Sequence, residues 1–203
     1  MKVRIIRICA VAVLLASGNA VAQDAAATAN NCNGCHGEAG VSQWGDMPTI
    51  AGIDAFTHAD ALYVYRDGER PCAESDYRTG DTSRASTTMC AIAADMSDDE
   101  IESIAEYYAG LTFVPAKQEF DAGLAAQGAD VHKAECDRCH SDGGANADDE
   151  ASILAGQWMP YLIDAFAHYA SWERPQDKKM QEKMDSLSAD QVEALLHYYA
   201  SQQ

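Results

Sequence analysis

Apolar residues recur at helical spacing in two segments of the chain, and each segment opens on a serine. After Ser97 and the acidic residues 98–100, the apolar positions are Ile101, Ile104, Ala105 and Tyr108. After Ser188, the apolar positions are Val192, Leu195, Leu196 and Tyr199. A polar cap followed by apolar residues three and four apart is typical of an amphipathic helix. No sustained alternation of polar and apolar residues indicates a strand, so we predict an all-α fold.

The two segments belong to an internal repeat. An offset of 104 residues pairs CNGCH at 32–36 with CDRCH at 136–140, and it also pairs the ERP sequences at 69–71 and 173–175. The two helical segments align at an offset of 91, so the first half carries 13 extra residues, near 72–88. Two copies are too few for a solenoid, which needs about three or more. The repeat therefore predicts two tandem domains.

The domain boundaries follow from the repeat and from one proline. The segment after the first repeat contains Pro115, and the next helical pattern starts near Glu119. We expect an N-terminal domain over 23–111, a linker over 112–118 and a C-terminal domain over 119–203.

The first 22 residues have the features of a signal peptide. A basic start precedes a short apolar run, and AVA at 20–22 resembles a signal-peptidase site. The alternative is a retained membrane anchor, but the run is shorter than the roughly 20 residues that span a bilayer. We therefore expect cleavage near Ala22, a periplasmic protein and no stable membrane insertion.

The chain is strongly acidic, with a formal net charge of −18. Cleavage would remove Lys2, Arg4 and Arg7 and no acid, so the mature chain would be more acidic still. This charge argues against nucleic acid and anionic membranes as partners and favours a basic partner surface. Solubility in a salty environment explains the charge equally well.

Both repeated motifs have the form CxxCH, which is the attachment signature of haem c. In such a motif the two thiols add to the vinyl groups of the porphyrin, and the histidine ligates the iron. The alternatives are a zinc site and a dithiol redox centre, which also use CxxC. Two copies in an exported chain favour two haem c groups, attached through Cys32, Cys35, Cys136 and Cys139, with His36 and His140 as iron ligands.

A sixth iron ligand is usually methionine or histidine. At an offset of 91, Met89 coincides with Met180, whereas Met47, Met96, Met159 and Met184 coincide with other residue types. The remaining histidines do not repeat either, so we expect surface or packing roles for His58, His132, His168 and His197. We predict Met89 as the ligand of the first iron and Met180 as that of the second.

With both axial positions filled, neither iron offers an open site to a substrate. The chain also lacks a Ser/His/Asp arrangement, a phosphate-binding glycine loop and a dinucleotide fingerprint. We therefore expect electron transfer rather than enzymatic activity, with no catalytic residues in this chain.

Other repeated side chains have two interpretations. Arg70 and Arg174 are equivalent, and a guanidinium group can pair with a haem propionate, but a solvated surface arginine is as good an explanation. The tyrosine pairs at 107–108 and 198–199 are interpreted as core packing.

Cys72 and Cys90 bracket most of the 13 extra residues and have no cysteine counterpart in the second half. In an exported protein a spare cysteine pair is more often a disulfide than a reactive site. We predict a Cys72 to Cys90 disulfide, which would stabilise the fold by roughly 3 kcal/mol and tether the insertion beside Met89.

Two CxxCH halves, each ending in a methionine, a serine-capped helix and a late YYA, resemble the dihaem cytochrome c4 type. The resemblance implies two class I cytochrome c domains, each wrapped around one haem. The sequences at 115–144 and 147–162 and the terminal YYASQQ resemble, more specifically, the cytochrome subunit of flavocytochrome c sulfide dehydrogenase. In that family the subunit accepts electrons from a flavoprotein (FAD) that oxidises sulfide. The insertion near 72–88 departs from this pattern.

Three functions compete at this point. The first is the cytochrome subunit of a flavoprotein sulfide dehydrogenase, and the second is a free-standing dihaem carrier between a respiratory complex and a terminal oxidase. The third is a haem enzyme in which one methionine leaves its iron and opens a site.

Overall fold

The computed structural model describes residues 28–203, so the predicted signal peptide lies outside the described residues. Within that range the fold is helical and has no strand, only an isolated bridge between Ser75 and Thr87, which confirms the all-α prediction. No helix in the same range is both long and apolar enough to cross a membrane. Residues 28–36 are helical, and the elements after them are η1 (Glu38–Gly40), α2 (Ala55–Arg66), α3 (Met89–Ala93), α4 (Asp98–Ala109), α5 (Ala122–Glu135), α6 (Ser141–Gly144), η2 (Ala147–Asp149), α7 (Met159–Ala170), α8 (Lys178–Ser186) and α9 (Ala189–Ser201).

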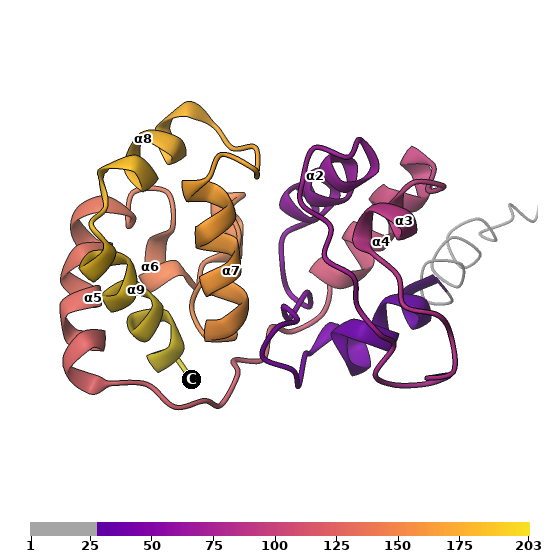
Figure 1. The fold of residues 1–203 in the computed structure, drawn as a ribbon, viewed down its shortest axis with the longest axis horizontal. Helices are drawn as coiled ribbons and strands as arrows, with labels where there is room; N and C mark the ends of the chain where they lie inside the picture. The colour runs from indigo at the N-terminus through magenta and orange to yellow at the C-terminus, as the bar shows by residue number, and fades with distance from the viewer. Residues whose placement is uncertain (1–27) are drawn as a thin grey trace, which may run out of the picture.

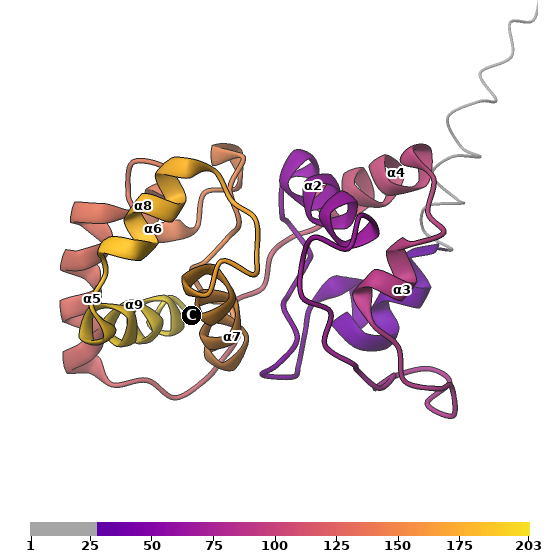
Figure 2. The same cartoon turned by 45° about the horizontal axis from the view of Figure 1, so that its top comes forward.

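The chain forms two helical halves that lie side by side (Figures 1 and 2). Helices α2, α3 and α4 form the first half with residues 28–36, and α5 to α9 form the second. Each half has its own apolar cluster, and the two clusters share no residue. Helices α2 and α7 face one another across the boundary in both views.

The core of the first half depends on α4. Ser97 caps this helix and forms a capping box with Glu100, as the acidic start predicts. The four apolar positions of α4 are all buried, and the Tyr108 hydroxyl donates to the Ala29 carbonyl oxygen at 3.0 Å. This bond ties α4 to the helix that carries the first CxxCH motif.

Helix α9 has the same role in the second half. Ser188 and Gln191 form its capping box, and Leu195, Leu196 and Tyr199 are buried in the core. Helix α5 crosses α9 closely at Gly128, where an added Cβ would lie 2.0 Å from the Ala194 carbonyl oxygen. The predicted closing helices are therefore confirmed in both halves.

The two halves are joined by polar contacts near the second motif. The Gln157 side chain accepts from the Thr49 amide at 3.0 Å and donates to the Thr49 carbonyl oxygen at 2.7 Å. The indole of Trp158 donates to the Ser42 carbonyl oxygen at 3.0 Å. The side-chain amide of Gln157 thus pairs with both backbone groups of Thr49, as a peptide group of a neighbouring strand would. This pairing fixes the halves relative to one another.

The connection between the halves is extended and packs on the second half. Helix α5 begins at Ala122, after the N-cap Asp121, rather than near Glu119. The Ala116 amide donates to the Gly156 carbonyl oxygen at 2.7 Å, and the Gln118 side chain donates to the Gln157 carbonyl oxygen at 2.7 Å. Residues 115–118 therefore belong structurally to the second half, whereas Phe113 packs closely on Gly52 of the first half.

Candidate haem-binding sites

The first CxxCH motif ends the helix at 28–36, and two of its side chains face the interior. Cys35 and His36 are both buried. The Nδ1 atom of His36 lies 3.0 Å from the Pro48 carbonyl oxygen, which fixes the ring and leaves Nε2 for a metal. Burial lowers the pKa of His36, and the neutral imidazole it favours is the form that ligates iron.

The second motif begins at Cys136, directly after α5, and ends at His140, which precedes α6. Nδ1 of His140 lies close to the Ser152 carbonyl oxygen, but the contact lacks the geometry of an ordinary hydrogen bond. Ser152 is the repeat equivalent of Pro48, so the two histidines have matching surroundings. Burial lowers the pKa of His140 as well.

The two predicted methionine ligands lie at the starts of equivalent helices. Met89 is the first residue of α3, and Met180 lies in the first turn of α8. Met89 packs on the same apolar cluster as Cys32, and Met180 packs on the same cluster as Cys136. In each half the structure thus gathers the predicted methionine and a motif cysteine at one core.

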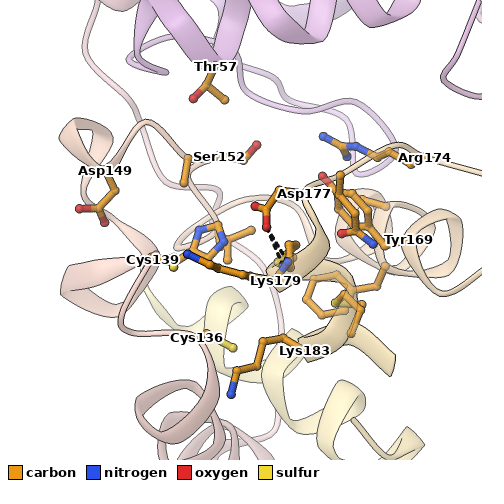
Figure 3. A pocket seen from close by; sticks show the side chains of 18 of the residues that line it. Thr57, Cys136, Cys139, Asp149, Ser152, Tyr169, Arg174, Asp177, Lys179 and Lys183 are labelled. Carbon is orange, nitrogen blue, oxygen red and sulfur yellow. Dashed lines mark hydrogen bonds between the residues drawn. The ribbon is translucent and has the colours of Figure 1, made fainter. Parts of the chain in front are cut away.

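A cavity of about 1320 Å³ opens beside the second motif (Figure 3). This volume exceeds the roughly 300–1,000 Å³ of ordinary ligand pockets. Cys136, Cys139, His140 and Met180 all line it. Its apolar wall comes from the second-half core, with Leu154, Leu162, Phe166 and Leu195 among the lining residues. An apolar cavity bordered by two thiols, an imidazole and a thioether fits a covalently attached haem.

Two arginines reach the boundary of this cavity from opposite halves. Arg70 stacks on Tyr65, with 4.5 Å from its guanidinium carbon to the ring centroid, and Arg174 stacks on Tyr169 at 4.4 Å. Both pairs obey the offset of 104, and Arg70, Arg174 and Tyr169 line the cavity beside Tyr161. Burial raises the pKa of Tyr161, but the two guanidinium groups outweigh burial and lower it. Arg70 and Arg174 are half-buried here, which disfavours solvated surface arginines and suits a negatively charged group.

Two buried histidines lie beside the predicted iron ligands. The His58 ring lies 5.4 Å from the Tyr108 ring, and burial, reinforced by His36, lowers the pKa of His58 to about 4. His132 Nδ1 lies 3.0 Å from the Tyr199 hydroxyl, and burial lowers its pKa. These contacts agree with the packing roles expected for both residues. Neither has a histidine at the equivalent position of the other half, so the repeat did not indicate that they lie close to the motifs. His168 and His197 are only partly buried.

Cys72 and Cys90 are joined by a disulfide, with their Cα atoms 5.8 Å apart. The other described cysteines, Cys32, Cys35, Cys136 and Cys139, are unpaired. The disulfide closes the segment that contains the insertion, and Met89 directly precedes one of its cysteines.

Comparison with known sequences identifies a cytochrome c-type domain in the second half. Residues 123–198 match the family model described as cytochrome C oxidase, cbb3-type, subunit III. The thiosulfate dehydrogenase electron acceptor of Stutzerimonas stutzeri (strain A1501) is 34% identical over 80 residues, which are 39% of this chain. The match spans only 32% of that relative.

Solved structures of similar fold cover most of the chain. Reduced cytochrome c4 from Pseudomonas stutzeri has a TM-score of 0.73 at 22% identity, over 90% of this chain and 98% of its own. Cytochrome c4 from Acidithiobacillus ferrooxidans has a TM-score of 0.66 at 20% identity, over 85% and 99%. Thiosulfate dehydrogenase (TsdBA) from Marichromatium purpuratum has a TM-score of 0.65 at 23% identity, over 85% of this chain and 36% of its own.

The fold is therefore that of the dihaem cytochromes c4. The family match, this fold and the two CxxCH motifs together support haem c, with iron, as the cofactor. They favour it over the zinc and dithiol interpretations.

Proposed function

We propose that the chain is a periplasmic dihaem c-type cytochrome that transfers electrons and catalyses no bond chemistry itself. The observation that carries the proposal is the second-half cavity, which Cys136, Cys139, His140 and Met180 all line. The first half repeats these residues as Cys32, Cys35, His36 and Met89. When bound, haem c supplies an iron that alternates between the ferrous and ferric states.

The protein groups around each site are suited to electron transfer. The Pro48 carbonyl oxygen orients His36, so the imidazole keeps one position in both redox states. A methionine thioether is a soft ligand that favours ferrous iron and raises the potential. Apolar side chains such as Leu162 and Leu195 exclude water from the second cavity, which limits solvent rearrangement during transfer.

For the electron donor, we propose a dehydrogenase that oxidises a reduced sulfur compound. The specific partner predicted from the sequence is a flavoprotein sulfide dehydrogenase that contains FAD. Similarity to a thiosulfate dehydrogenase electron acceptor supports the broader class of donor. The purified dihaem protein should be reduced by sulfide in the presence of the flavoprotein and should co-purify with it. A stable monomer that sulfide and flavoprotein leave oxidised would refute this assignment.

A free-standing carrier is the second candidate. The chain matches 98% of the length of a cytochrome c4, which favours a protein that works without a permanent partner subunit. Reduction by a quinol-oxidising complex and reoxidation by a terminal oxidase would support the carrier. Reduction by thiosulfate with a thiosulfate dehydrogenase would favour the sulfur-linked role with a different donor.

A further inference from the structure

The two motifs differ in how far they are exposed. Cys35 is only 7% exposed, whereas Cys139, its equivalent at the offset of 104, is exposed and lines the cavity of the second half. The two cysteines of a CxxCH motif attach one edge of the porphyrin. A segment that covers a motif therefore keeps that edge away from a partner protein.

Residues 74–86, the insertion bracketed by the disulfide, cover the first motif. The amides of Arg78 and Thr79 donate to the Gly34 carbonyl oxygen at 2.8 and 3.1 Å. The Thr79 hydroxyl donates to the Asn33 carbonyl oxygen at 2.9 Å. Asn33 and Gly34 are the two residues between the motif cysteines, so the cover binds the centre of the motif.

The cover is held in place from several directions. Tyr77 is only 8% exposed, and the Arg84 guanidinium lies 3.7 Å from its ring centroid. Arg78 forms a two-fold contact with Asp46, with N to O distances of 2.6 and 2.5 Å. At its base, Ser75 and Thr87 exchange backbone hydrogen bonds of 2.8 and 2.9 Å beside the disulfide. These contacts indicate one fixed position over the motif.

The residues inside the two motifs match this difference. An added Cβ at Gly34 would lie 2.8 Å from Cδ1 of Tyr77, so the cover requires glycine there. The equivalent residue in the second motif is Arg138, which is exposed, and the second half has no counterpart of residues 74–86. Arg138 and Cys139 line the cavity of the second half.

We propose that residues 74–86 are a fixed cover that keeps external redox proteins away from the first motif. The first site exchanges electrons with the outside through the second half. This inference rests on the proposed function, because it presupposes two loaded haem sites.

The inference can be tested by solvent exposure of the two motifs in the loaded, reduced protein. A neutral gadolinium chelate broadens the NMR signals of nearby protons, and its neutrality avoids bias from the acidic surface. We expect the NMR signals of protons beside the Cys139 sulfur to broaden several-fold more than those of protons beside the Cys35 sulfur. Equal broadening in a fully loaded and reducible protein would overturn the cover and leave the proposed function intact. A protein that binds no haem would overturn both.

Two variants of the cover and one control variant make the test specific to the cover. Deletion of residues 74–86 should raise broadening at Cys35 to the level at Cys139. Gly34→Arg, which displaces Tyr77 without shortening the chain, should have the same effect if the deletion variant does not fold. The reciprocal variant Arg138→Gly should leave exposure at Cys139 unchanged, because no segment is available to cover it. Unchanged broadening at Cys35 in the folded Gly34→Arg variant would contradict the proposal.

Discussion

The side chains of Gln176 and Gln181 are hydrogen-bonded to each other at the repeat positions of Cys72 and Cys90. The Gln181 amide also donates to Asp185 Oδ1 at 2.7 Å. Both halves therefore link the segment after the ERP proline to the helix that carries the predicted methionine ligand. The first half makes this link with a covalent bond, and the second makes it with a partly buried amide pair.

Removal of the disulfide should lower the free energy of unfolding more than removal of the glutamine pair. We expect Cys72→Ser with Cys90→Ser to lower the free energy of unfolding by about 3 kcal/mol, because the disulfide limits the unfolded chain. The matched pair Gln176→Ser with Gln181→Ser should lower it by about 1 kcal/mol. Guanidinium unfolding of the loaded protein measures both. Equal losses in the two double variants would contradict the comparison.

The methionine assignments predict a separate effect for each half. Met89→Ala and Met180→Ala should each remove half of the absorption band from methionine-to-iron charge transfer and lower one of the two reduction potentials. Met96→Leu is the control, because Met96 packs on the first core without a methionine equivalent in the second half. A full band in Met89→Ala would refute that ligand. A missing band at one site of the unmodified protein would instead support the haem enzyme with a labile methionine.

Arg174 should raise the potential of the nearer iron through its charge. Reduction removes one positive charge from the site, so a nearby guanidinium favours the reduced state. For two unit charges roughly 10 Å apart at an effective dielectric constant near 20, Coulomb's law gives about 1–2 kcal/mol, or tens of millivolts. Arg174→Ala should lower one potential by that amount in a potentiometric titration. Arg66→Ala is a suitable control, since Arg66 also stacks on a tyrosine but pairs with Asp98 at the surface. A similar decrease in both variants would argue against a specific role.

Burial of His58 predicts a loss of stability in acid. Its pKa falls from 6.5 to about 4 on folding, so the unfolded chain binds a proton that the folded chain refuses. The stabilisation is complete above pH 6.5 and decreases as the pH falls toward 4, by up to about 3 kcal/mol. His58→Leu should flatten this decrease in unfolding experiments at a series of pH values. His168→Leu, at a partly exposed position, should not, and an unchanged slope in His58→Leu would refute the assignment.

Gln157 should hold the two halves together during unfolding. Gln157→Leu leaves the buried Thr49 amide and carbonyl groups without partners, which costs about 1–3 kcal/mol for each group. We expect one calorimetric transition in the unmodified protein and two in the variant. Gln127→Leu, on the exposed face of α5, is the control. A single transition in Gln157→Leu at an unchanged temperature would contradict this role.

Local and repeated signals made much of the fold and of the sites predictable from the sequence. The serine caps and apolar spacing of α4 and α9 depend on neighbouring residues, so they could be recognised along the chain. The CxxCH motifs and the methionine pair stood out because the repeat gives each residue an equivalent. The repeat also identified Arg70 and Arg174 as an equivalent pair. It did not predict that their side chains are half-buried.

Contacts specific to one half were not predictable in this way. Gln157 corresponds to Ile53 in the first half, so the repeat gave no sign of a contact between halves. Trp172 has a φ of 62° at the position of Gly68, a left-handed conformation that tryptophan rarely adopts. The match of Gly34 with Tyr77 depends on residues 43 positions apart, whose meeting only the folded chain reveals.

The extended connection between the halves decides where the second half begins as an autonomous folding unit. Its Ala116 and Gln118 bond to backbone groups of Gly156 and Gln157, and the Gln203 side chain donates to the Gln118 carbonyl oxygen at 2.8 Å. A recombinant fragment that starts at Glu119, where the helical pattern begins, would lack these contacts along one edge. A fragment that starts at Pro115 retains them. We therefore expect a fragment that starts at Pro115 to fold around a single haem better than one that starts at Glu119.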